Sequence, residues 1–542
     1  MTVAHPKTMR LSTPADLVGL TVPMLLERRA QHSPFRVALS AQSVTGFRDR
    51  LGYAQLVLYM QRVASGLADL GVRQGDRVGV YLTNDAGREA VLTALGCFSL
   101  GAAVAPLNTR SSAEELAHAL KLVRPALVVT TTAFSKRVRS VYTAPIALID
   151  APQTLVPSRD MHRWPEPTVV TELLPPRVDV SSDEPACLLY TSGTTSLAKA
   201  VVHSHSNMLH AGLAMGLAVG LGPNDLYQGA FPFFTSSCLN LGCMSSWVHG
   251  AGFVMEHDIE NVQRLRLVES ECATVYHGVP AVIQFMLDEA GRNSYNLRSL
   301  RRVCYGGAAM PPSAIERIAQ SWPWMEQVHV WGMTESGPAG AWLPPHWLPG
   351  RAGCMGQAMP YCELRVIDDA GRPAPRGTPG ELLFRGPSMA VGYFESPEAT
   401  AEAFRGGWLH TGDVVVESDD GLLWFVDRKK DVINRGGLKI SSVAVEATLL
   451  RISGIAEVAV LGIPHARLGE DVAACVVAVA GERLDIEAMK AWCTQHLADY
   501  EVPRRWIILE ALPKNPMGKV LKRDLREVLR SSMILLQDAS SP

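Results

Sequence analysis

The sequence predicts an α/β protein with a large N-terminal body, made of parallel-rich sheets with helices plus a small β-rich unit, and a small α+β C-terminal lobe. Three observations predict this class. The 542 residues provide for several domains at roughly 150 residues each. Helical and strand periods alternate to about residue 360, which is typical of parallel sheets. After residue 351 helices become scarce, and short strands separated by glycine and proline turns follow.

The first α/β run covers about residues 22–170. Residues 53–70 place apolar side chains at a spacing of three to four and end at Gly71, as an amphipathic helix does. Residues 88–101 repeat the helical spacing. Short apolar segments predict buried strands between and after these helices, at residues 75–84, 104–108 and 125–131.

A proline-containing stretch at residues 152–186 predicts a surface linker, after which a second α/β run reaches about residue 360. This run opens with an apolar strand from Ala186 to Tyr190. A hydroxyl-rich turn follows at residues 191–196, and a helix is expected from about Ser206. The loop is therefore expected on a strand-to-helix turn.

The C-terminal part divides into two patterns. Short strands predict a small β-rich unit, at residues 363–369, 380–386, 392–394 and 422–428. Two helices and two strands then predict a compact lobe, at residues 441–452, 456–464, 471–480 and 486–497. The chain thus divides into a body of residues 1–428 and a lobe of residues 431–542.

Composition excludes several classes of protein. Fifty-one basic and 53 acidic residues give a net charge of −2, so no bulk charge favours nucleic acid as a partner. The ten cysteines form no Cys-x-x-Cys pair, and we expect them to be buried apolar residues in a reducing compartment. No apolar run is long enough to span a membrane, and the N-terminus lacks the pattern of a secretory signal. We therefore expect a cytoplasmic protein.

The most informative stretch is the loop after the strand that ends at Tyr190. Clustered hydroxyls beside a glycine can present O–H and N–H groups to phosphate oxygens, and Lys199 could add a positive charge. The Walker pattern does not fit, because Ala198 and Ala200 occupy its second glycine and its hydroxyl position. A loop of this composition can also be an ordinary turn.

Five further motifs could carry chemistry, although each also fits an ordinary structural role. Residues 331–335 (WGMTE) offer an aromatic ring, a hydroxyl and a carboxylate. Residues 411–413 (TGD) are expected to form a turn whose aspartate grips a ribose or caps the turn. Residues 427–431 are a charge run, residues 435–439 a glycine loop, and residues 513–519 end in Lys519.

The order and spacing of these motifs resemble the adenylate-forming superfamily, which contains acyl-CoA ligases, peptide-synthetase adenylation domains and firefly-type luciferases. The resemblance covers nearly the whole chain and includes residues 51–56, 75–84, 101–110 and 305–311. It implies an acid–thiol ligase that joins a carboxylate to ATP, releases pyrophosphate, and passes the acyl group of the resulting acyl-AMP to coenzyme A.

The resemblance also implies roles for individual residues. Phosphates, adenine and ribose would be held by a nucleotide set of Thr191, Ser192, Thr194, Thr195, Lys199, Gly307, Ala308, Ala309, Trp331, Gly332, Thr334, Asp413 and Arg428. Lys519, Thr334 and Glu335 would be catalytic, with Mg²⁺ on Glu335 and Lys519 between the α-phosphate and the acyl carboxylate. The lobe would be mobile about a hinge at residues 429–430, centred on Lys430, and would bring Gly436 and Gly437 to the CoA thiol tunnel.

The phosphate loop departs from the family pattern T-S-G-T-T-G-x-P-K-G at Ser196, Ala198 and Ala200. If such a position requires a positive φ, a side chain there costs roughly 1–3 kcal/mol. Only adenylation uses the β- and γ-phosphates. The sequence therefore supports thioester formation from acyl-AMP better than ATP-dependent adenylation, although an ordinary two-step ligase remains open.

The acyl pocket would be formed by residues 231–240 together with Gly306, with Phe234, Thr235 and Cys238 among its lining residues. Residues 229–245 carry no charge, which disfavours amino acids and dicarboxylates. We therefore expect an apolar carboxylic acid, or its adenylate, that is aromatic, alicyclic or fatty.

Four alternatives remain open. The protein could perform only the thioester half-reaction beside a companion adenylating enzyme, or it could load a carrier protein. It could be an inactive nucleotide-binding scaffold, although Lys519, Glu335 and Asp413 argue against that. A hydrolase is disfavoured by the absence of a G-x-S-x-G motif.

Overall fold

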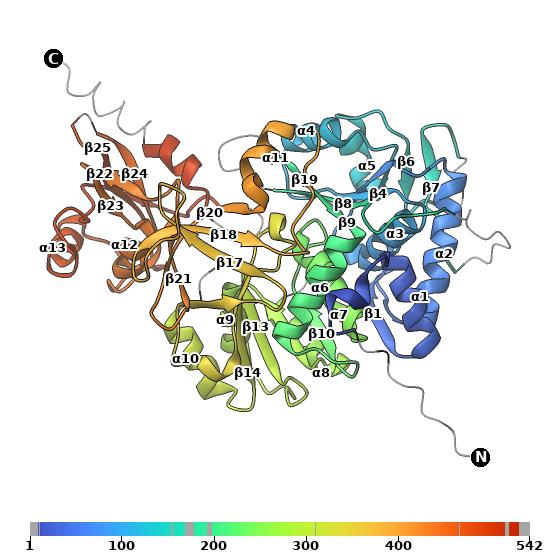
Figure 1. The fold of residues 1–542 in the computed structure, drawn as a ribbon, viewed down its shortest axis with the longest axis horizontal. Helices are drawn as coiled ribbons and strands as arrows, with labels where there is room; N and C mark the ends of the chain where they lie inside the picture. The colour runs from blue at the N-terminus through green and yellow to red at the C-terminus, as the bar shows by residue number, and fades with distance from the viewer. Residues whose placement is uncertain are drawn as a thin grey trace. The chain divides into compact units, whose positions relative to one another are not determined.

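The computed structural model describes residues 9, 11–152, 154, 157–168, 178–191, 198–258, 260–308, 310–465, 467–514 and 520–529 (Figure 1). The chain forms two compact units. The first comprises Met1–Thr191, Leu197–Leu364 and Leu383–His410, and the second comprises Ser192–Ser196, Arg365–Leu382 and Thr411–Pro542. The predicted boundary at residues 428–431 is a different division and stays a prediction.

The first unit contains two mostly parallel sheets. One has the strand order β16-β15-β14-β13-β12-β10-β11-β1-β2. Its strands are β1 (Val37–Gln42), β2 (Arg48–Gly52), β10 (Leu226–Gly229), β11 (Gly252–Met255), β12 (Val275–Gly278), β13 (Arg302–Gly306), β14 (Glu326–Trp331), β15 (Ala341–Leu343) and β16 (Cys354–Ala358). The strands from β1 to β14 are parallel, whereas β2, β15 and β16 are antiparallel to their neighbours.

The second sheet of this unit has the order β19-β9-β8-β4-β3-β5-β6-β7. Its strands are β3 (Arg77–Tyr81), β4 (Ala103–Pro106), β5 (Leu127–Thr130), β6 (Ile146–Leu148), β7 (Met161–Arg163), β8 (Pro185–Tyr190), β9 (Ala200–Ser204) and β19 (Gly392–Tyr393). Strands β3 to β8 pair in parallel, and β9 and β19 are antiparallel additions.

Helices complete an alternation of helix and sheet layers. The apolar core between the two sheets takes side chains from α1 (Val22–His32), α2 (Tyr53–Asp69), α3 (Gly87–Ser99), α6 (His205–Val219) and α7 (Met244–His249). The outer face of the first sheet packs against α8 (Asn261–Glu271), α9 (Pro280–Ala290) and α10 (Pro312–Ser321). The outer face of the second sheet packs against α4 (Ala113–Val123) and α5 (Thr132–Arg139). A short helix, α11 (Pro397–Ala403), follows β19.

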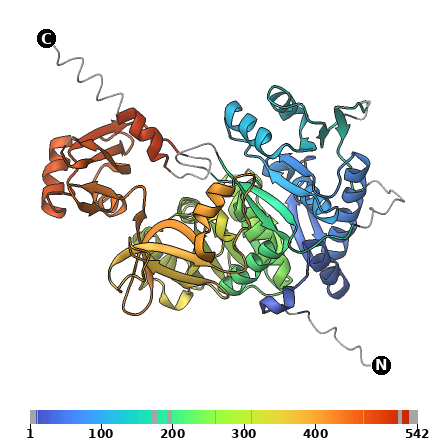
Figure 2. The ribbon, with the colours of Figure 1, turned by 45° about the horizontal axis from the view of Figure 1, so that its top comes forward.

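The second unit holds a β-rich part and a lobe. The β-rich part has the order β17-β18-β20-β21, with β17 (Glu363–Ile367), β18 (Pro379–Arg385), β20 (Leu409–Glu417) and β21 (Leu423–Arg428), and the division between the units falls within β17, β18 and β20. The lobe sheet, in orange and red in Figure 2, contains β22 (Ile433–Arg435), β23 (Leu438–Ile440), β24 (Ile455–His465), β25 (Gly469–Ala478) and β26 (Arg505–Leu509). Its helices are α12 (Ser442–Leu449) and α13 (Ile486–His496).

The predicted α/β class is confirmed, and the helix over residues 53–70 illustrates why the pattern was sufficient. Apolar side chains that recur every three or four residues are buried on one face of α2. Gly71 then adopts a φ of +93°, which a side chain would disfavour. No helix in the described residues is long and apolar enough to cross a membrane.

Several predictions of local structure are wrong. Residues 411–413 lie inside β20 rather than in a turn, because they continue a strand paired with β21. The predicted linker contains β7, and the elements that were not predicted include β9, β20, β22, β23, β26 and α11. The cysteines are free, but Cys272 is exposed and Cys362 is half-buried, so not all ten are core residues.

Candidate functional site

Four neighbouring parallel strands of the first sheet end at one edge. In strand order these are β10, β12, β13 and β14, which end at Gly229, Gly278, Gly306 and Trp331. The carboxyl edge of parallel strands is where open α/β sheets bind ligands. Two of the predicted motifs, residues 305–311 and 331–335, therefore begin at adjacent positions along this edge.

The residues after β13 and β14 suit close approach by a flat ligand. A side chain at Gly306 would lie 2.5 Å from the carbonyl oxygen of Val330, so only glycine fits there. Gly307 has a φ of +79°, and both it and Ala308 are exposed. Trp331 is half-buried on the neighbouring strand. The fold thus brings together the residues predicted to flank adenine, except Ala309, which lies outside the described residues.

Residues 332–335 turn sharply after β14. A side chain at Gly332 would collide with the carbonyl oxygen of Pro338, so the turn requires glycine. Thr334 opens a short 3-10 helix (Thr334–Ser336). The backbone oxygen of Thr334 accepts a hydrogen bond from Nε2 of His203 at 2.9 Å. Burial lowers the pKa of His203 to about 4, so this imidazole is neutral and Nε2 carries the proton.

Thr334 also meets the predicted acyl segment. Its hydroxyl lies 3.3 Å from the hydroxyl of Ser236, which belongs to residues 231–240. The predicted nucleotide motif and the predicted acyl segment are therefore in contact within one unit.

Glu335 is a buried carboxylate with a fixed orientation. It is 7 % exposed, and the hydroxyl of Tyr393 donates to its Oε1 at 2.9 Å. Burial and the neighbouring carboxylate raise the pKa of Tyr393, so the phenol stays protonated as the donor. The ammonium group of Lys199 lies 4.9 Å from the centre of the Tyr393 ring. A buried carboxylate beside a threonine hydroxyl offers the oxygen ligands that Mg²⁺ prefers, so these residues fit the predicted metal.

The phosphate loop joins two antiparallel strands, β8 and β9. The backbone N–H of Thr191 donates to the carbonyl oxygen of Lys199 at 3.0 Å, which closes the base of the loop. The predicted strand-to-helix turn is wrong, because β9 separates the loop from α6. Ser192, Thr194, Thr195 and Ser196 lie outside the described residues.

The strain predicted at Ala198 and Ala200 is not observed, because neither residue has a positive φ. Ala200 is fully buried in β9 and pairs in register with Tyr190. Ala200 occupies a regular strand position, which tolerates a side chain, and Ala198 lies before the strand without a positive φ, so at these two positions the departure from the family pattern carries no backbone penalty. The corresponding prediction for Ser196 stays untested.

The acyl segment is held by a residue to which the sequence gave no role. The side-chain amide of Asn84 donates to the carbonyl oxygens of Phe231 and Glu256 at 2.9 and 2.7 Å, and its oxygen accepts from the N–H of Phe233 at 2.9 Å. Asn84 ends the motif of residues 75–84. The sequence signal for it was a polar residue three positions after the buried strand β3.

After the residues that Asn84 binds, the acyl segment continues into a π-helix, Ser237–Cys243. Such helices are rare and often occur at functional sites. Cys238 is fully buried in it, whereas Phe234 and Thr235 before it are half-buried. The hydroxyl of Thr235 donates to the carbonyl oxygen of Pro232.

In the second unit, the fold brings the two predicted ribose residues together. Asp413 on β20 and Arg428 on β21 pair in register, and Nε of Arg428 lies 2.5 Å from Oδ1 of Asp413. The carboxylate is 1 % exposed, while Arg428 is half-buried. Lys430 is exposed directly after β21.

Gly436 and Gly437 form the two-residue loop of the β22–β23 hairpin, with φ values of +61° and +90°. Two positive φ values in succession define a type I′ turn, which explains the glycines without reference to a ligand. Lys519 lies outside the described residues. The predicted CoA and catalytic roles of these three residues stay predictions.

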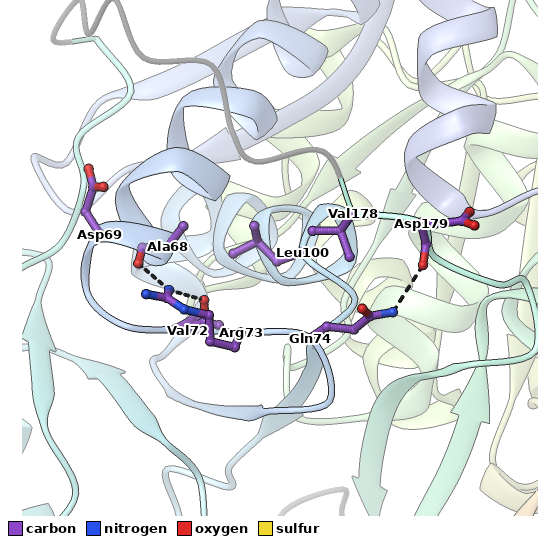
Figure 3. Close-up of a pocket in the computed structure, with 8 residues that line it drawn as sticks. All are labelled: Ala68, Asp69, Val72, Arg73, Gln74, Leu100, Val178 and Asp179. Atoms are coloured by element: carbon purple, nitrogen blue, oxygen red, sulfur yellow. Dashed lines mark hydrogen bonds between the residues drawn. The ribbon is translucent and has the colours of Figure 1, made fainter.

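A cavity of about 680 Å³ in the first unit is lined by none of the predicted site residues (Figure 3). It is lined by Ala68, Asp69, Val72, Arg73, Gln74, Leu100, Val178 and Asp179. Arg73 donates to the carbonyl oxygens of Ala68 and Val72, and Gln74 donates to that of Asp179, so these polar groups serve the local backbone. Elsewhere in the described ranges, no group of three or more His, Cys, Asp or Glu could hold a metal ion.

Comparison with known proteins gives consistent matches. The family model for AMP-binding enzyme matches residues 26–394, and that for the AMP-binding enzyme C-terminal domain matches residues 444–519. A feruloyl-CoA synthase of Amycolatopsis is 31% identical over 92% of this chain and 97% of its own. A long-chain-fatty-acid–CoA ligase of Mycobacterium tuberculosis is 30% identical over 93% of this chain and 97% of its own. The structure of O-succinylbenzoate coenzyme A synthetase from Bacillus subtilis with AMP matches with a TM-score of 0.81 at 26% identity, over 93% of this chain and 98% of that one.

Proposed function

The chain belongs to the AMP-binding enzyme family, the adenylate-forming acid–thiol ligases, and from this premise we propose that it converts an apolar carboxylic acid into its CoA thioester in two steps. In the first step a carboxylate oxygen attacks the α-phosphate of ATP, which forms acyl-AMP and releases pyrophosphate. In the second step the CoA thiol loses its proton and attacks the acyl carbon, and AMP leaves. The observation that carries the proposal is the contact between the hydroxyls of Ser236 and Thr334, which joins the acyl segment to the nucleotide motif.

The nucleotide would be held at the carboxyl edge of the first sheet. Trp331 and Gly307–Ala308 would receive adenine, while the hydroxyls of Thr191 and Thr334 would donate to phosphate oxygens. Glu335 would hold Mg²⁺, which neutralises charge on the phosphates when it is bound. The hydrogen bond from Tyr393 keeps the Glu335 carboxylate in one orientation.

The same proposal includes adenylation as well as thioester formation. Ala200 lies in a regular strand, so the altered loop is not strained there. The thioester half-reaction alone, with a companion enzyme that supplies acyl-AMP, is an outcome of the test below. In the second unit, Asp413 and Arg428 would bind the ribose, Lys430 would act as the hinge, and Gly436 and Gly437 would line the thiol tunnel.

The acid is expected to lack a second charge. Residues 229–245 contain no ionisable acidic or basic group except the buried thiols of Cys238 and Cys243, and a buried carboxylate or ammonium of a substrate would remain unpaired there. Two of the relatives named above are a feruloyl-CoA synthase and a long-chain-fatty-acid–CoA ligase, so aromatic and fatty monocarboxylic acids are the first to test.

The test offers the protein two sets of substrates. One set contains ATP, Mg²⁺, CoA and a panel of aromatic, alicyclic and fatty acids, and the other contains synthetic acyl-AMP with CoA. We expect acyl-CoA from both. Acyl-CoA from acyl-AMP alone would establish the half-reaction, and acylation of a carrier protein without CoA turnover would establish the carrier-loading alternative. No thioester from either set would refute the proposal.

Lys519→Ala tests the assignment of the two steps. We expect the variant to lose adenylation while it retains turnover of supplied acyl-AMP. Lys514→Ala is the matched control, because Lys514 is a neighbouring lysine whose ammonium group is paired with Glu457 at 2.6 Å. An equal loss of both steps in Lys519→Ala would contradict the assignment.

A further inference from the structure

His277 is a buried histidine at the carboxyl end of β12, and it has no part in the roles described above. It is 3 % exposed. It pairs in register with Gly229 on one side and with Cys304 on the other. Residues in register share a face of the sheet, and Cys304 belongs to the same apolar core as Phe231 and Cys238. His277 therefore lies on the face that the acyl segment covers.

The residues around His277 leave it beside the predicted acyl pocket. The ring of Phe231, which opens the acyl segment, meets the imidazole edge-on at 4.9 Å. Gly229 has no side chain, and Gly306 lies two residues beyond Cys304 on the same face. The ring of Phe231 fills the space at Gly229, because a Cβ there would lie 2.8 Å from that ring, and the predicted pocket residues Phe234 and Cys238 follow Phe231 along the chain.

The hydrogen bond to Tyr227 determines which ring nitrogen carries the proton. The phenol oxygen of Tyr227 lies 2.5 Å from Nδ1 of His277, and Tyr227 is fully buried. Burial lowers the pKa of His277 to about 3, so the imidazole is neutral, and burial raises the pKa of Tyr227, so the phenol is protonated. If Nδ1 carried the proton, the Tyr227 hydroxyl hydrogen would have no acceptor among the described residues, which is costly for a buried donor.

Tyr227 is therefore the donor, Nδ1 is the acceptor, and the single proton of the neutral ring is on Nε2. Nε2 lies at the end of the ring that points away from the backbone. Within the described part of the chain it makes no hydrogen bond, and it is not one of the fully buried side-chain atoms that lack a partner, so it keeps some contact with solvent. The Nε2–H group is thus a neutral donor that stays available to a molecule bound beside the ring of Phe231.

We propose that the acyl pocket selects carboxylic acids whose apolar body carries a neutral hydrogen-bond acceptor, such as a ketone, ether or phenol oxygen, which receives the Nε2–H of His277. This inference rests on the proposed function, because it concerns the acyl site of the same reaction. It narrows the substrate from an apolar acid in general to an oxygenated one. Tyr227 acts as a positioning residue that holds His277 in the donor tautomer.

The test uses pairs of acids that differ in one acceptor. Suitable pairs are para-methoxyphenylpropanoic acid with para-ethylphenylpropanoic acid, and oxocyclohexylpropanoic acid with methylidenecyclohexylpropanoic acid. Each pair keeps the shape and exchanges an oxygen for a carbon. We expect the oxygenated member of at least one pair to be favoured about tenfold in kcat/KM for acyl-CoA formation, the effect of one buried hydrogen bond.

Three variants show whether His277 is the donor. His277→Phe should reduce the preference to within about twofold, whereas His277→Gln keeps an N–H donor and should retain part of it. Tyr227→Phe keeps the imidazole but removes the hydroxyl that donates to Nδ1, so the ring proton is no longer confined to Nε2. This variant should also reduce the preference for the oxygenated acid. Equal use of both members of every pair by the parent enzyme, or a preference that survives in His277→Phe, would overturn the inference.

Binding measurements separate this inference from the proposed function. Acyl-sulfamoyl-adenosine analogues of the same pairs occupy the acyl and nucleotide sites without reaction, and calorimetry gives their affinities. A preference in binding that is lost in His277→Phe supports the inference even if no thioester is formed, in which case only the proposed function fails. Equal affinities for both members overturn the inference even if thioester is formed.

Discussion

Substitution of Ala200 by glycine restores the residue of the family loop pattern and tests whether that departure limits adenylation. In the structure Ala200 is a strand residue with no positive φ, fully buried, and packed with Leu188 in an apolar cluster. Its carbonyl oxygen accepts a hydrogen bond from the N–H of Phe394 at 2.8 Å. Glycine therefore has no conformational advantage at this position, and the substitution removes a buried methyl group.

The magnitude follows from two losses. Removal of one buried methyl group costs about 0.8 kcal/mol, and glycine within a strand costs about 0.5–1 kcal/mol relative to alanine. The sum is a decrease of about 1.5 kcal/mol in the free energy of unfolding. For a cooperative unit of about 400 residues, the unfolding entropy converts this into a fall of about 2 °C in Tm.

The assays are differential scanning calorimetry and pyrophosphate release with ATP, Mg²⁺ and an accepted acid. We expect Ala200→Gly to melt about 2 °C below the parent, without faster pyrophosphate release. Ala198→Gly is the control, because Ala198 is only half-buried and lies outside β9. A variant as stable as the parent that releases pyrophosphate several-fold faster would refute the reasoning.

Three further substitutions test other parts of the structure. Tyr393→Phe removes the donor to Oε1 of Glu335, and because hydrogen bonds to charged groups contribute about 1.5–3 kcal/mol, we expect the Mg²⁺ concentration for half-maximal adenylation to rise at least tenfold. Asp413→Asn removes the charge opposite Arg428, and calorimetry should show AMP binding weakened about tenfold; unchanged affinity would contradict the ribose assignment. Burial lowers the pKa of His205 to about 4, so between pH 6.5 and pH 4 only the unfolded chain takes up this proton. This lowers the free energy of unfolding as pH falls, by about 1.4 kcal/mol per pH unit, and His205→Gln should flatten that dependence in urea denaturation by the same amount.

The fold class could be predicted because periodicity records burial. Residues 53–70 and 441–452 show helical spacing in the sequence, and both segments are helices over most of their length. Secondary structure was harder to predict for segments that pair with strands distant in the sequence. The TGD motif contains glycine and aspartate, which are typical of turns, but its pairing with β21 makes it a strand.

The candidate site could be predicted only as a set of motifs. The sequence indicated Thr334, Glu335, Asp413 and Arg428 because their residue types and order match a family. It could not indicate Tyr393, which follows Glu335 by 58 positions and reaches its carboxylate only in the folded chain. Asn84 is a similar case, since its hydrogen bonds to the acyl segment join residues separated by about 150 positions.

The sequence by itself determined the α/β class, the membership of the adenylate-forming family and the order of the motifs, because each depends on residue type and local spacing. Tertiary structure decided which groups meet. It placed Ala200 in an unstrained strand, and it set the phenol of Tyr227 against Nδ1 of His277. Protonation, orientation and strain depend on neighbours in space, and a linear pattern does not contain them.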